Sequence, residues 1–296
     1  MTAGRDLPTL VRWAREAEDA GFDSVMISEH IVLGPSAGAN GVMPNPREYA
    51  LPGNQDPATP WPSSLVLLSA IAAVTERIRL VAGAVIAPLR HPLLIARELG
   101  SLDLLSGGRL VVLPTVSWLE EEYAALGVPF RSRGDLLDEH LEAWAVLWRD
   151  TPASFSGTHY SFRDVYFEPK AFRPAGPALW LGGAGMHRRM TERIVRYADG
   201  FNPLGRPSAE QMRRLDAALR AAGRDPAGLE LVGGTRAVFG DDRRVADLGQ
   251  ALATIPPQVA AGFTTFCLKP SQFTDDPRHV GRLCRDIVRR VDGLLP

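Results

Sequence analysis

The most constraining feature of this sequence is a regular alternation of short apolar runs with segments of helical periodicity, which continues from the first residues to the last. Such alternation is typical of a parallel sheet whose strands are joined by crossover helices. Seven strands are expected, at residues 22–28, 78–87, 109–116, 178–181, 200–204, 229–239 and 264–268. A closed (β/α)8 barrel needs eight strands, and this chain begins with a helix instead. The pattern therefore predicts a TIM (β/α)8-type barrel that lacks its first strand, in a single domain covering residues 1–296.

Two segments interrupt this alternation. Residues 31–61 form a long loop rich in Pro, Gly and Asn, and a loop of this length within a compact domain usually has a function. Between residues 154 and 168, aromatic and polar residues alternate around Gly157, which predicts a β-hairpin excursion rather than a second domain. At the start of the chain, Asp6 is placed to cap a helix that Gly21 ends.

The charge balance excludes several classes of partner. The chain has 33 Lys and Arg residues against 34 Asp and Glu residues, a formal net charge of -1, so we expect no nucleic-acid partner and no membrane partner. No apolar stretch approaches the ~20 residues that a bilayer requires, and the N-terminus does not resemble a signal peptide. Cys267 and Cys284 show no disulfide spacing, which fits a cytoplasmic protein. No histidines or carboxylates have the spacing of metal ligands, so no metal site is expected.

The strand ends direct attention to one histidine. In barrels of this kind, catalytic groups lie at the carboxyl ends of the strands and in the loops that follow. His30 comes shortly after the first expected strand and is the strongest catalytic candidate, because imidazole titrates near neutral pH and the adjacent Glu29 can fix its tautomer. A strand-end histidine that bonds a backbone carbonyl explains the position equally well. His91, which precedes Pro92 at a helix start, is interpreted as a helix cap or a loop brace.

A glycine-rich turn follows the strand at 178–181 and opens a helix. It consists of Gly182, Gly183, Ala184 and Gly185, followed by Met186. Free backbone amides and the positive end of the helix dipole can hold a phosphate at such a turn, and phosphate sites recur at the late strands of barrels. The alternative is a plain tight turn. Arg188 and Arg189 either add positive charge to this site or face solvent.

Two further groups follow the strand at 109–116. Trp118 can form an apolar wall against a planar cofactor, although most tryptophans are core residues. Glu120, Glu121 and Glu122 are interpreted as the acidic first turn of a solvated helix, where they interact favourably with the helix dipole. We therefore expect no general base among them.

Several segments together resemble the bacterial luciferase-like monooxygenase superfamily, and specifically its coenzyme F420-dependent oxidoreductase branch. The resemblance extends over nearly the whole chain, and the joint occurrence of the motifs is more specific than any one of them. The segments that carry it are Ala20-Gly21-Phe22-Asp23-Ser24-Val25, Ser28-Glu29-His30, Thr75-Glu76-Arg77-Ile78-Arg79-Leu80, Leu89-Arg90-His91-Pro92, Leu102-Asp103-Leu104-Leu105-Ser106-Gly107-Gly108-Arg109-Leu110, Trp118-Leu119-Glu120-Glu121-Glu122-Tyr123, Leu126-Gly127-Val128-Pro129-Phe130, Leu181-Gly182-Gly183 and Ala198-Asp199-Gly200-Phe201.

The resemblance implies a homodimeric TIM barrel that binds an isoalloxazine-like ring over the strand ends and acts on a small-molecule substrate. His30 would then be a proton donor or acceptor beside the ring, or part of the substrate pocket. A backbone bulge at Ala84 and Val85 would support the ring, and residues 182–186 would hold the phosphate of the coenzyme. Further cofactor contacts are expected from Glu29, Thr115 and Trp118. The cofactor would carry the hydride chemistry, while the barrel orients it and excludes water.

The chain departs from the family pattern in three places. The first strand is absent, so either the start is truncated or the barrel has a gap that exposes a sheet edge. The family often has Asp at the position of Glu29. Where the family commonly has glycines after Gly107-Gly108-Arg109, this chain has Leu113, Pro114, Thr115 and Ser117, and bulkier side chains there would narrow the cofactor site.

Three functions therefore stay open. The leading hypothesis is an oxidoreductase that transfers a hydride between coenzyme F420 and a small organic substrate. The second is an FMN-dependent monooxygenase of the luciferase-like type. The third is a cofactor-free barrel without enzymatic activity, which the missing strand and the replaced glycines would explain.

Overall fold

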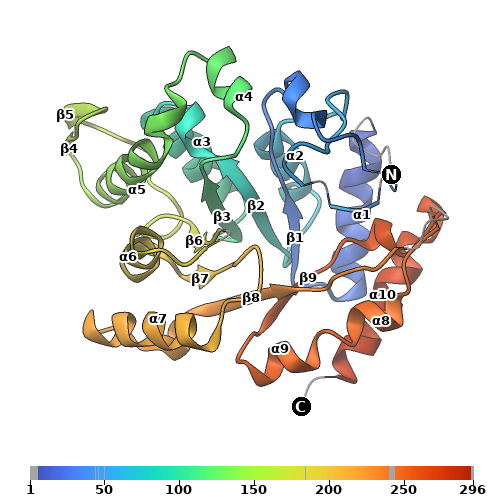
Figure 1. Ribbon diagram of the computed structural model, residues 1–296. Helices are drawn as coiled ribbons and strands as arrows, with labels where there is room; N and C mark the ends of the chain where they lie inside the picture. The colour runs from blue at the N-terminus through green and yellow to red at the C-terminus, as the bar shows by residue number, and fades with distance from the viewer. Residues whose placement is uncertain are drawn as a thin grey trace.

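The computed structural model describes residues 6–43, 45, 47–49, 51–183, 185–239 and 244–294. A seven-stranded parallel sheet curls around the centre and helices pack on its outer side (Figure 1). In sheet order the strands are β1 (Ser24–Ile27), β2 (Arg79–Ile86), β3 (Leu110–Thr115), β6 (Ala178–Leu181), β7 (Gly200–Phe201), β8 (Glu230–Gly234) and β9 (Thr265–Cys267). The predicted TIM-barrel-type fold with seven strands is confirmed. Within the described residues no strand pairs with the outer edge of β1 or β9, so the eighth position of the barrel is not filled.

The helices surround this sheet, and the first packs against the last beside the gap. They are α1 (Leu7–Ala20), α2 (Ser64–Ala72), α3 (Pro92–Leu105), α4 (Glu120–Ala125), α5 (Arg133–Arg149), α6 (Arg188–Tyr197), α7 (Ala209–Ala221), α8 (Leu248–Leu252), α9 (Pro256–Ala260) and α10 (Val280–Asp292). Helices α1 and α10, the first and last of the described chain, lie side by side (Figure 1). Helix α1 begins and ends as predicted, because the Asp6 side chain accepts a hydrogen bond from the Thr9 amide and Gly21 has a φ of 97°.

Two other local predictions are confirmed. The excursion is an antiparallel hairpin of β4 (Ala153–Ser156) and β5 (Ser161–Val165), which lies outside the main sheet beside α5 (Figure 1). His91 caps α3, since its Nδ1 accepts a hydrogen bond from the Leu93 amide at 3.2 Å. By contrast, the strand expected at 229–239 ends at Gly234, and the chain leaves the sheet there.

An ion pair across the barrel interior shows how strongly the sheet curls. Arg79, at the start of β2, donates two hydrogen bonds of 2.9 and 2.8 Å to Glu230, at the start of β8. These strands are not neighbours in the sheet. Trp180 Nε1 also donates to Glu230, at 3.1 Å. The amino ends of the strands are thus bridged by side chains, which leaves the carboxyl ends as the place for a ligand.

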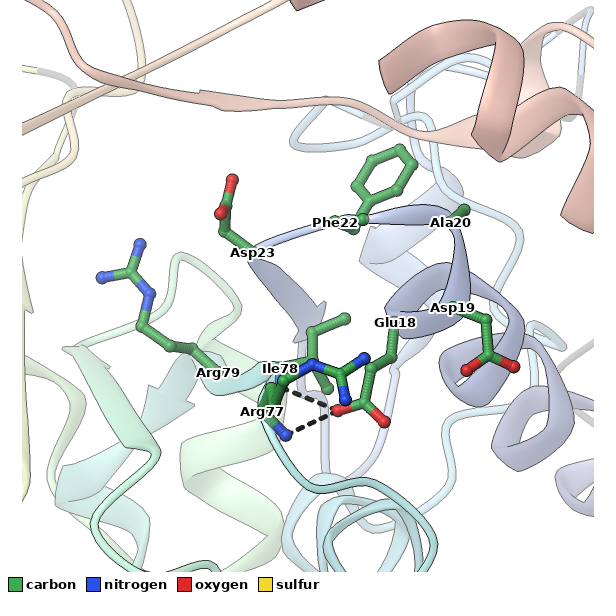
Figure 2. A pocket seen from close by; sticks show the side chains of 9 residues that line it. Glu18, Asp19, Ala20, Phe22, Asp23, Arg77, Ile78 and Arg79 are labelled. Atoms are coloured by element: carbon green, nitrogen blue, oxygen red, sulfur yellow. Dashed lines mark hydrogen bonds between the residues drawn. The ribbon is translucent and has the colours of Figure 1, made fainter. Parts of the chain in front are cut away.

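A hollow of about 590 Å³ lies at the amino ends of β1 and β2 (Figure 2). Beside it, one Glu18 carboxylate oxygen accepts hydrogen bonds from the amides of Glu76, Arg77 and Ile78 at 2.9, 2.6 and 2.9 Å. Burial raises the pKa of Glu18, but these hydrogen bonds outweigh it and the net shift is downward. Glu18 therefore fixes the turn that leads into β2. Because active sites of such barrels lie at the opposite end, we assign no chemistry to this hollow.

The Ser106-Gly107-Gly108-Arg109 motif also has a structural explanation. Gly107 and Gly108 have φ values of 66° and 81°, which turn the chain sharply after α3. The Arg109 guanidinium then donates to the carbonyl oxygens of Ala72, Thr75, Ile78 and Ser106. One arginine therefore joins the end of α2, the start of β2 and the turn after α3.

Candidate functional site

The candidate site lies at the carboxyl ends of the strands. Because all strands of the main sheet are parallel, the loops after β1, β2 and β3 leave the same edge of the sheet. These loops carry His30, Arg90 and Ser117, and helix α4 follows directly after the third of them. The edge thus collects an imidazole, a guanidinium and several carboxylates.

His30 pairs with a buried carboxylate. Its Nδ1 lies 3.2 Å from Glu122 Oε2, and the side chains of His30 and Glu122 are 10% and 0% exposed. The other oxygen, Oε1, accepts the Ile31 amide at 2.5 Å, and Ser117 Oγ donates to Oε2 at 3.3 Å. A carboxylate at Nδ1 favours the tautomer with its proton on Nδ1. The Nε2 lone pair is then free, since no described group hydrogen-bonds that nitrogen.

Two indole rings flank the His30 imidazole. The centroids of Trp61 and Trp118 lie 5.0 and 6.2 Å from that of His30, with interplanar angles of 74° and 80°. Edge-to-face packing of this kind limits rotation of the imidazole and shields it from water. Trp61 Nε1 is buried and has no hydrogen-bond partner among the described residues. Trp118 was predicted as a wall beside a cofactor, whereas no feature of the sequence pointed to Trp61.

Glu29 is held by a different set of donors. Arg90 binds both of its carboxylate oxygens, with Nη1 3.0 Å from Oε2 and Nη2 2.6 Å from Oε1. The Ile86 amide donates to Oε2 at 3.0 Å, and Ser64 Oγ lies 3.3 Å from Oε1. For Arg90, burial lowers the pKa, but the hydrogen bonds and charge of Glu29 outweigh it and the net shift is upward. Glu29 thereby braces the end of β2.

The two carboxylates correct the sequence interpretation. The prediction that Glu29 orients His30 is wrong, because Glu122 occupies that place. The interpretation of Glu122 as part of a solvated helix face is also wrong, since its side chain is fully buried. Glu120 is exposed, as expected, and the half-buried Glu121 accepts hydrogen bonds from the amide and hydroxyl of Ser36. With four donors around its two oxygens, Glu29 has no acceptor left for a cofactor.

The predicted bulge is present within β2. The pairing of β2 with β3 shifts register between Gly83 and Val85. Val85 is completely buried in the core under the helices, whereas Ala84 is half-buried. A Cβ on Gly83 would lie 3.0 Å from the Met26 side chain, so the strand has little spare room there. Of the two bulge residues, Ala84 is the one with surface left for a ligand.

The residues that stand where the family commonly has glycines lie in β3 or directly after it. Leu113 packs inside the barrel against the cluster that contains Val81 and Trp180. Pro114 is buried and pairs with Val85 across the bulge, and Thr115 is half-buried at the end of β3. Ser117 has a φ of 58°, a conformation that glycine adopts most easily.

The glycine-rich turn after β6 divides into structural and open positions. A Cβ on Gly182 would lie 1.6 Å from the Asn202 carbonyl oxygen, so the packing of β7 already requires glycine there. Gly183 would meet only the end of the Met190 side chain, at 3.2 Å, and Gly185 would meet nothing within 4 Å. Ala184 lies outside the described residues. Met186, the last residue predicted to contact the cofactor, is half-buried before α6.

The arginines of α6 do not add charge to this turn. Arg188 is 90% exposed and pairs with Glu192 at 3.1 Å, and Arg189 binds Asp135 and Asp138 of α5. The helix is capped by His187, whose Nδ1 accepts the Met190 amide at 3.3 Å. Among the described residues, the amides of Gly185 and Met186 donate to no other group. These amides, rather than the arginines, are what the turn offers to a phosphate.

The family of the chain follows from comparison with known proteins. Residues 1–266 match the family model of luciferase-like monooxygenases. The chain belongs to this family. An uncharacterized protein of Mycobacterium tuberculosis strain H37Rv is 35% identical over 217 residues, which are 72% of this chain and 74% of that protein. Among the described residues, no helix of this family member is long and apolar enough to span a bilayer.

Two further similarities point to different cofactors. The FMNH2-dependent dimethylsulfone monooxygenase of Pseudomonas putida is 28% identical over 135 residues, 44% of this chain and 37% of that enzyme. The coenzyme F420-dependent tetrahydromethanopterin reductase of Methanopyrus kandleri has the same fold, with a TM-score of 0.70, 13% identity and coverage of 96% of each chain. The proteins that this chain resembles thus include one named for FMNH2 and one named for coenzyme F420.

Proposed function

We propose that this protein is an oxidoreductase that transfers a hydride between coenzyme F420 and a small organic substrate, with His30 as the proton donor or acceptor. The observation that carries the proposal is the pairing of His30 Nδ1 with the buried Glu122 carboxylate, which leaves Nε2 at the carboxyl ends of the strands. Oxidation of an alcohol-type substrate removes a hydride from carbon and a proton from oxygen. The deazaflavin would supply the hydride chemistry, and Nε2 would take the proton.

The other residues of the site support this role. Trp61 and Trp118 hold the imidazole in place and keep water from it. The bulge at Ala84 and the carboxyl end of β3 at Thr115 would contact the ring of the coenzyme. The amides of Gly185 and Met186 would hold its phosphate. The unpartnered Trp61 Nε1 fits a hydrogen bond to a bound ligand.

The cofactor is tested by fluorescence titration of the purified protein with F420 and with FMN. We expect tight binding of F420. Tight binding of FMN with no response to F420 would favour the alternative, an FMN-dependent monooxygenase, which the similarity to the Pseudomonas putida enzyme supports. Absence of binding of either group would favour the cofactor-free barrel, with the interior narrowed by Leu113 and Pro114.

A pair of glycine variants tests the phosphate turn. Gly185→Ala meets no neighbour within 4 Å, so it is expected to fold normally and to weaken coenzyme binding only if the turn approaches the phosphate closely. Gly182→Ala places a Cβ 1.6 Å from the Asn202 carbonyl and is expected to destabilise the protein even without coenzyme. Unchanged coenzyme affinity in Gly185→Ala would argue against a phosphate site at this turn.

His30→Ala is expected to lower turnover about 10²-fold or more while leaving the fold intact. Unchanged turnover would remove His30 from the mechanism. A cytoplasmic location, which the cysteine spacing favours, and a homodimer, which the family resemblance implies, stay predictions.

A further inference from the structure

Lys269 lies two residues beyond β9, at the same edge of the sheet as His30. The chain has only two lysines, and the other is Lys170. The ammonium of Lys269 donates to the Arg47 carbonyl at 3.2 Å and lies 5.4 Å from the centroid of the Tyr49 ring. Both partners belong to the loop at 31–61. Lys269 therefore ties this loop to the end of β9.

The Lys269 ammonium lacks a negative partner in the part of the chain that the structure describes. Among the described residues, no carboxylate forms an ion pair with Lys269, although Lys170 lies 3.8 Å from Glu168. Asp275, six residues beyond Lys269 in the chain, is bound by the Arg47 guanidinium. Burial lowers the pKa of Lys269, and no neighbouring charge opposes that effect. A partly buried cation without a counter-ion is costly unless a ligand supplies one.

The surroundings leave Lys269 free to bind such a ligand. An ammonium has three N–H donors, and the Arg47 carbonyl takes one of them. The Gln272 amide donates to the same carbonyl at 3.1 Å, so this carbonyl is held from two sides. Gln272 is 2% exposed, and its Oε1 has no partner among the described residues. This corner, formed by Lys269 and Gln272, therefore offers two N–H donors of the Lys269 ammonium and the Gln272 Oε1 acceptor, which have no partner among the described residues.

One loop connects this corner with His30. Trp61, near the end of the loop, packs against the His30 ring, and Tyr49 and Arg47, earlier in the same loop, contact Lys269. Strands β1 and β9, which carry the two sites, lie at the two sides of the open position in the barrel. The loop at 31–61 therefore joins the two groups at the open side of the barrel.

We propose that Lys269 binds an oxyanion, either a carboxylate or a phosphate, on the substrate that reacts beside His30. This inference rests on the proposed function, because the reaction at His30 is what makes this edge a substrate site. The cofactor also carries oxyanions, but the turn at residues 182–186 is the place proposed for its phosphate. The substrate class is accordingly a small organic acid or a phosphorylated alcohol.

The test uses the protein without cofactor and measures the acetylation of each lysine by mass spectrometry after a short pulse of acetic anhydride. Inorganic phosphate and succinate are the probes, and chloride at equal ionic strength is the control. A probe at ten times its Kd is expected to slow acetylation of Lys269 about tenfold. Lys170 is expected to react at the same rate throughout. Equal acetylation of Lys269 with and without both probes would overturn the proposal.

Variants separate an anion-binding role from a structural one. Calorimetric titration uses succinate, because the turn at residues 182–186 is itself proposed to hold a phosphate. Succinate is expected to bind Lys269→Arg, which keeps the charge, and not Lys269→Met. Lys170→Met is the matched control and should bind like the wild type. Binding of succinate to Lys269→Met with the wild-type affinity would overturn the assignment.

Two more titrations show whether the oxyanion belongs to the substrate or to the cofactor, and whether the protein binds a cofactor at all. Protection of Lys269 by F420 or FMN alone would show that the oxyanion belongs to the cofactor, which overturns the assignment to the substrate. Loss of cofactor binding is read separately, by fluorescence, and leaves the acetylation result intact. The two proposals can therefore fail independently.

Discussion

Replacement of Glu122 by glutamine tests the carboxylate–imidazole pair directly. Glu122→Gln keeps the side-chain volume and an oxygen for the Ile31 amide, but it removes the charge next to His30 Nδ1. A hydrogen bond to a charged group contributes about 1.5–3 kcal/mol. Because about 1.4 kcal/mol corresponds to a factor of ten, the hydrogen bond to Glu122 should keep at least about 90% of the neutral His30 in the Nδ1–H tautomer. In the variant, the glutamine amide donates to Nδ1, and the proton is expected to move to Nε2.

The tautomer is measured by long-range ¹H–¹⁵N correlation on protein labelled at its six histidines, with His30 assigned from a His30→Gln variant. Glu121→Gln is the matched control, because Glu121 lies next in the chain but binds Ser36 rather than His30. An Nε2–H tautomer of His30 in the wild type, unchanged in Glu122→Gln, would refute the reasoning. Glu122→Ala additionally leaves the Ile31 amide without an acceptor and should destabilise the fold by about 1–3 kcal/mol.

Three other predictions concern stability and assembly. Arg90→Met leaves the buried Glu29 charge unpaired and should lower the free energy of unfolding by about 3 kcal/mol in urea denaturation, with part of the loss recovered in Arg90→Met/Glu29→Gln. Burial lowers the pKa of His140 in the folded protein, so the unfolded chain takes up a proton first as the pH falls. The free energy of unfolding should therefore decrease as the pH drops below about 6.5, and His140→Gln should remove this pH dependence. The expected homodimer is tested by sedimentation of the wild type, and a monomeric wild type would contradict it. Leu94→Glu, on the exposed apolar side of α3, is the test variant, and Leu204→Glu is the control.

The strands were predictable because the central strands β2, β3, β6 and β7 are largely buried and most strands are bounded by polar or glycine-rich turns. The error at 229–239 has a physical cause. Phe239 packs against the small cluster around Ala246 and Phe273 rather than extending β8, and that contact depends on tertiary structure. Further along the chain, Asp247 caps the short helix α8, and Pro256 begins the separate helix α9.

The site was only partly predictable. His30 was identified from its place after a strand, and the order of the motifs pointed to the family. Glu122 was not identified, because three consecutive glutamates at a helix start give no sign of which one faces the core. That choice depends on how α4 docks on the loop after β1, where the amides of Ile31 and Val32 point at Glu122 Oε1.

The two buried carboxylates have different environments, and the difference indicates which one would serve the proposed proton transfer at His30. Glu29 faces a guanidinium at 2.6 and 3.0 Å, so its charge is neutralised before any substrate arrives. Glu122 accepts hydrogen bonds from backbone amides and a hydroxyl, and no described guanidinium or ammonium hydrogen-bonds it. Its remaining partner is His30. In the proposed proton transfer to Nε2, the imidazolium formed would be stabilised by the adjacent Glu122 carboxylate. A carboxylate already paired with arginine offers no such stabilisation, which is why replacement of Glu122 is expected to affect proton transfer and replacement of Glu29 to affect folding.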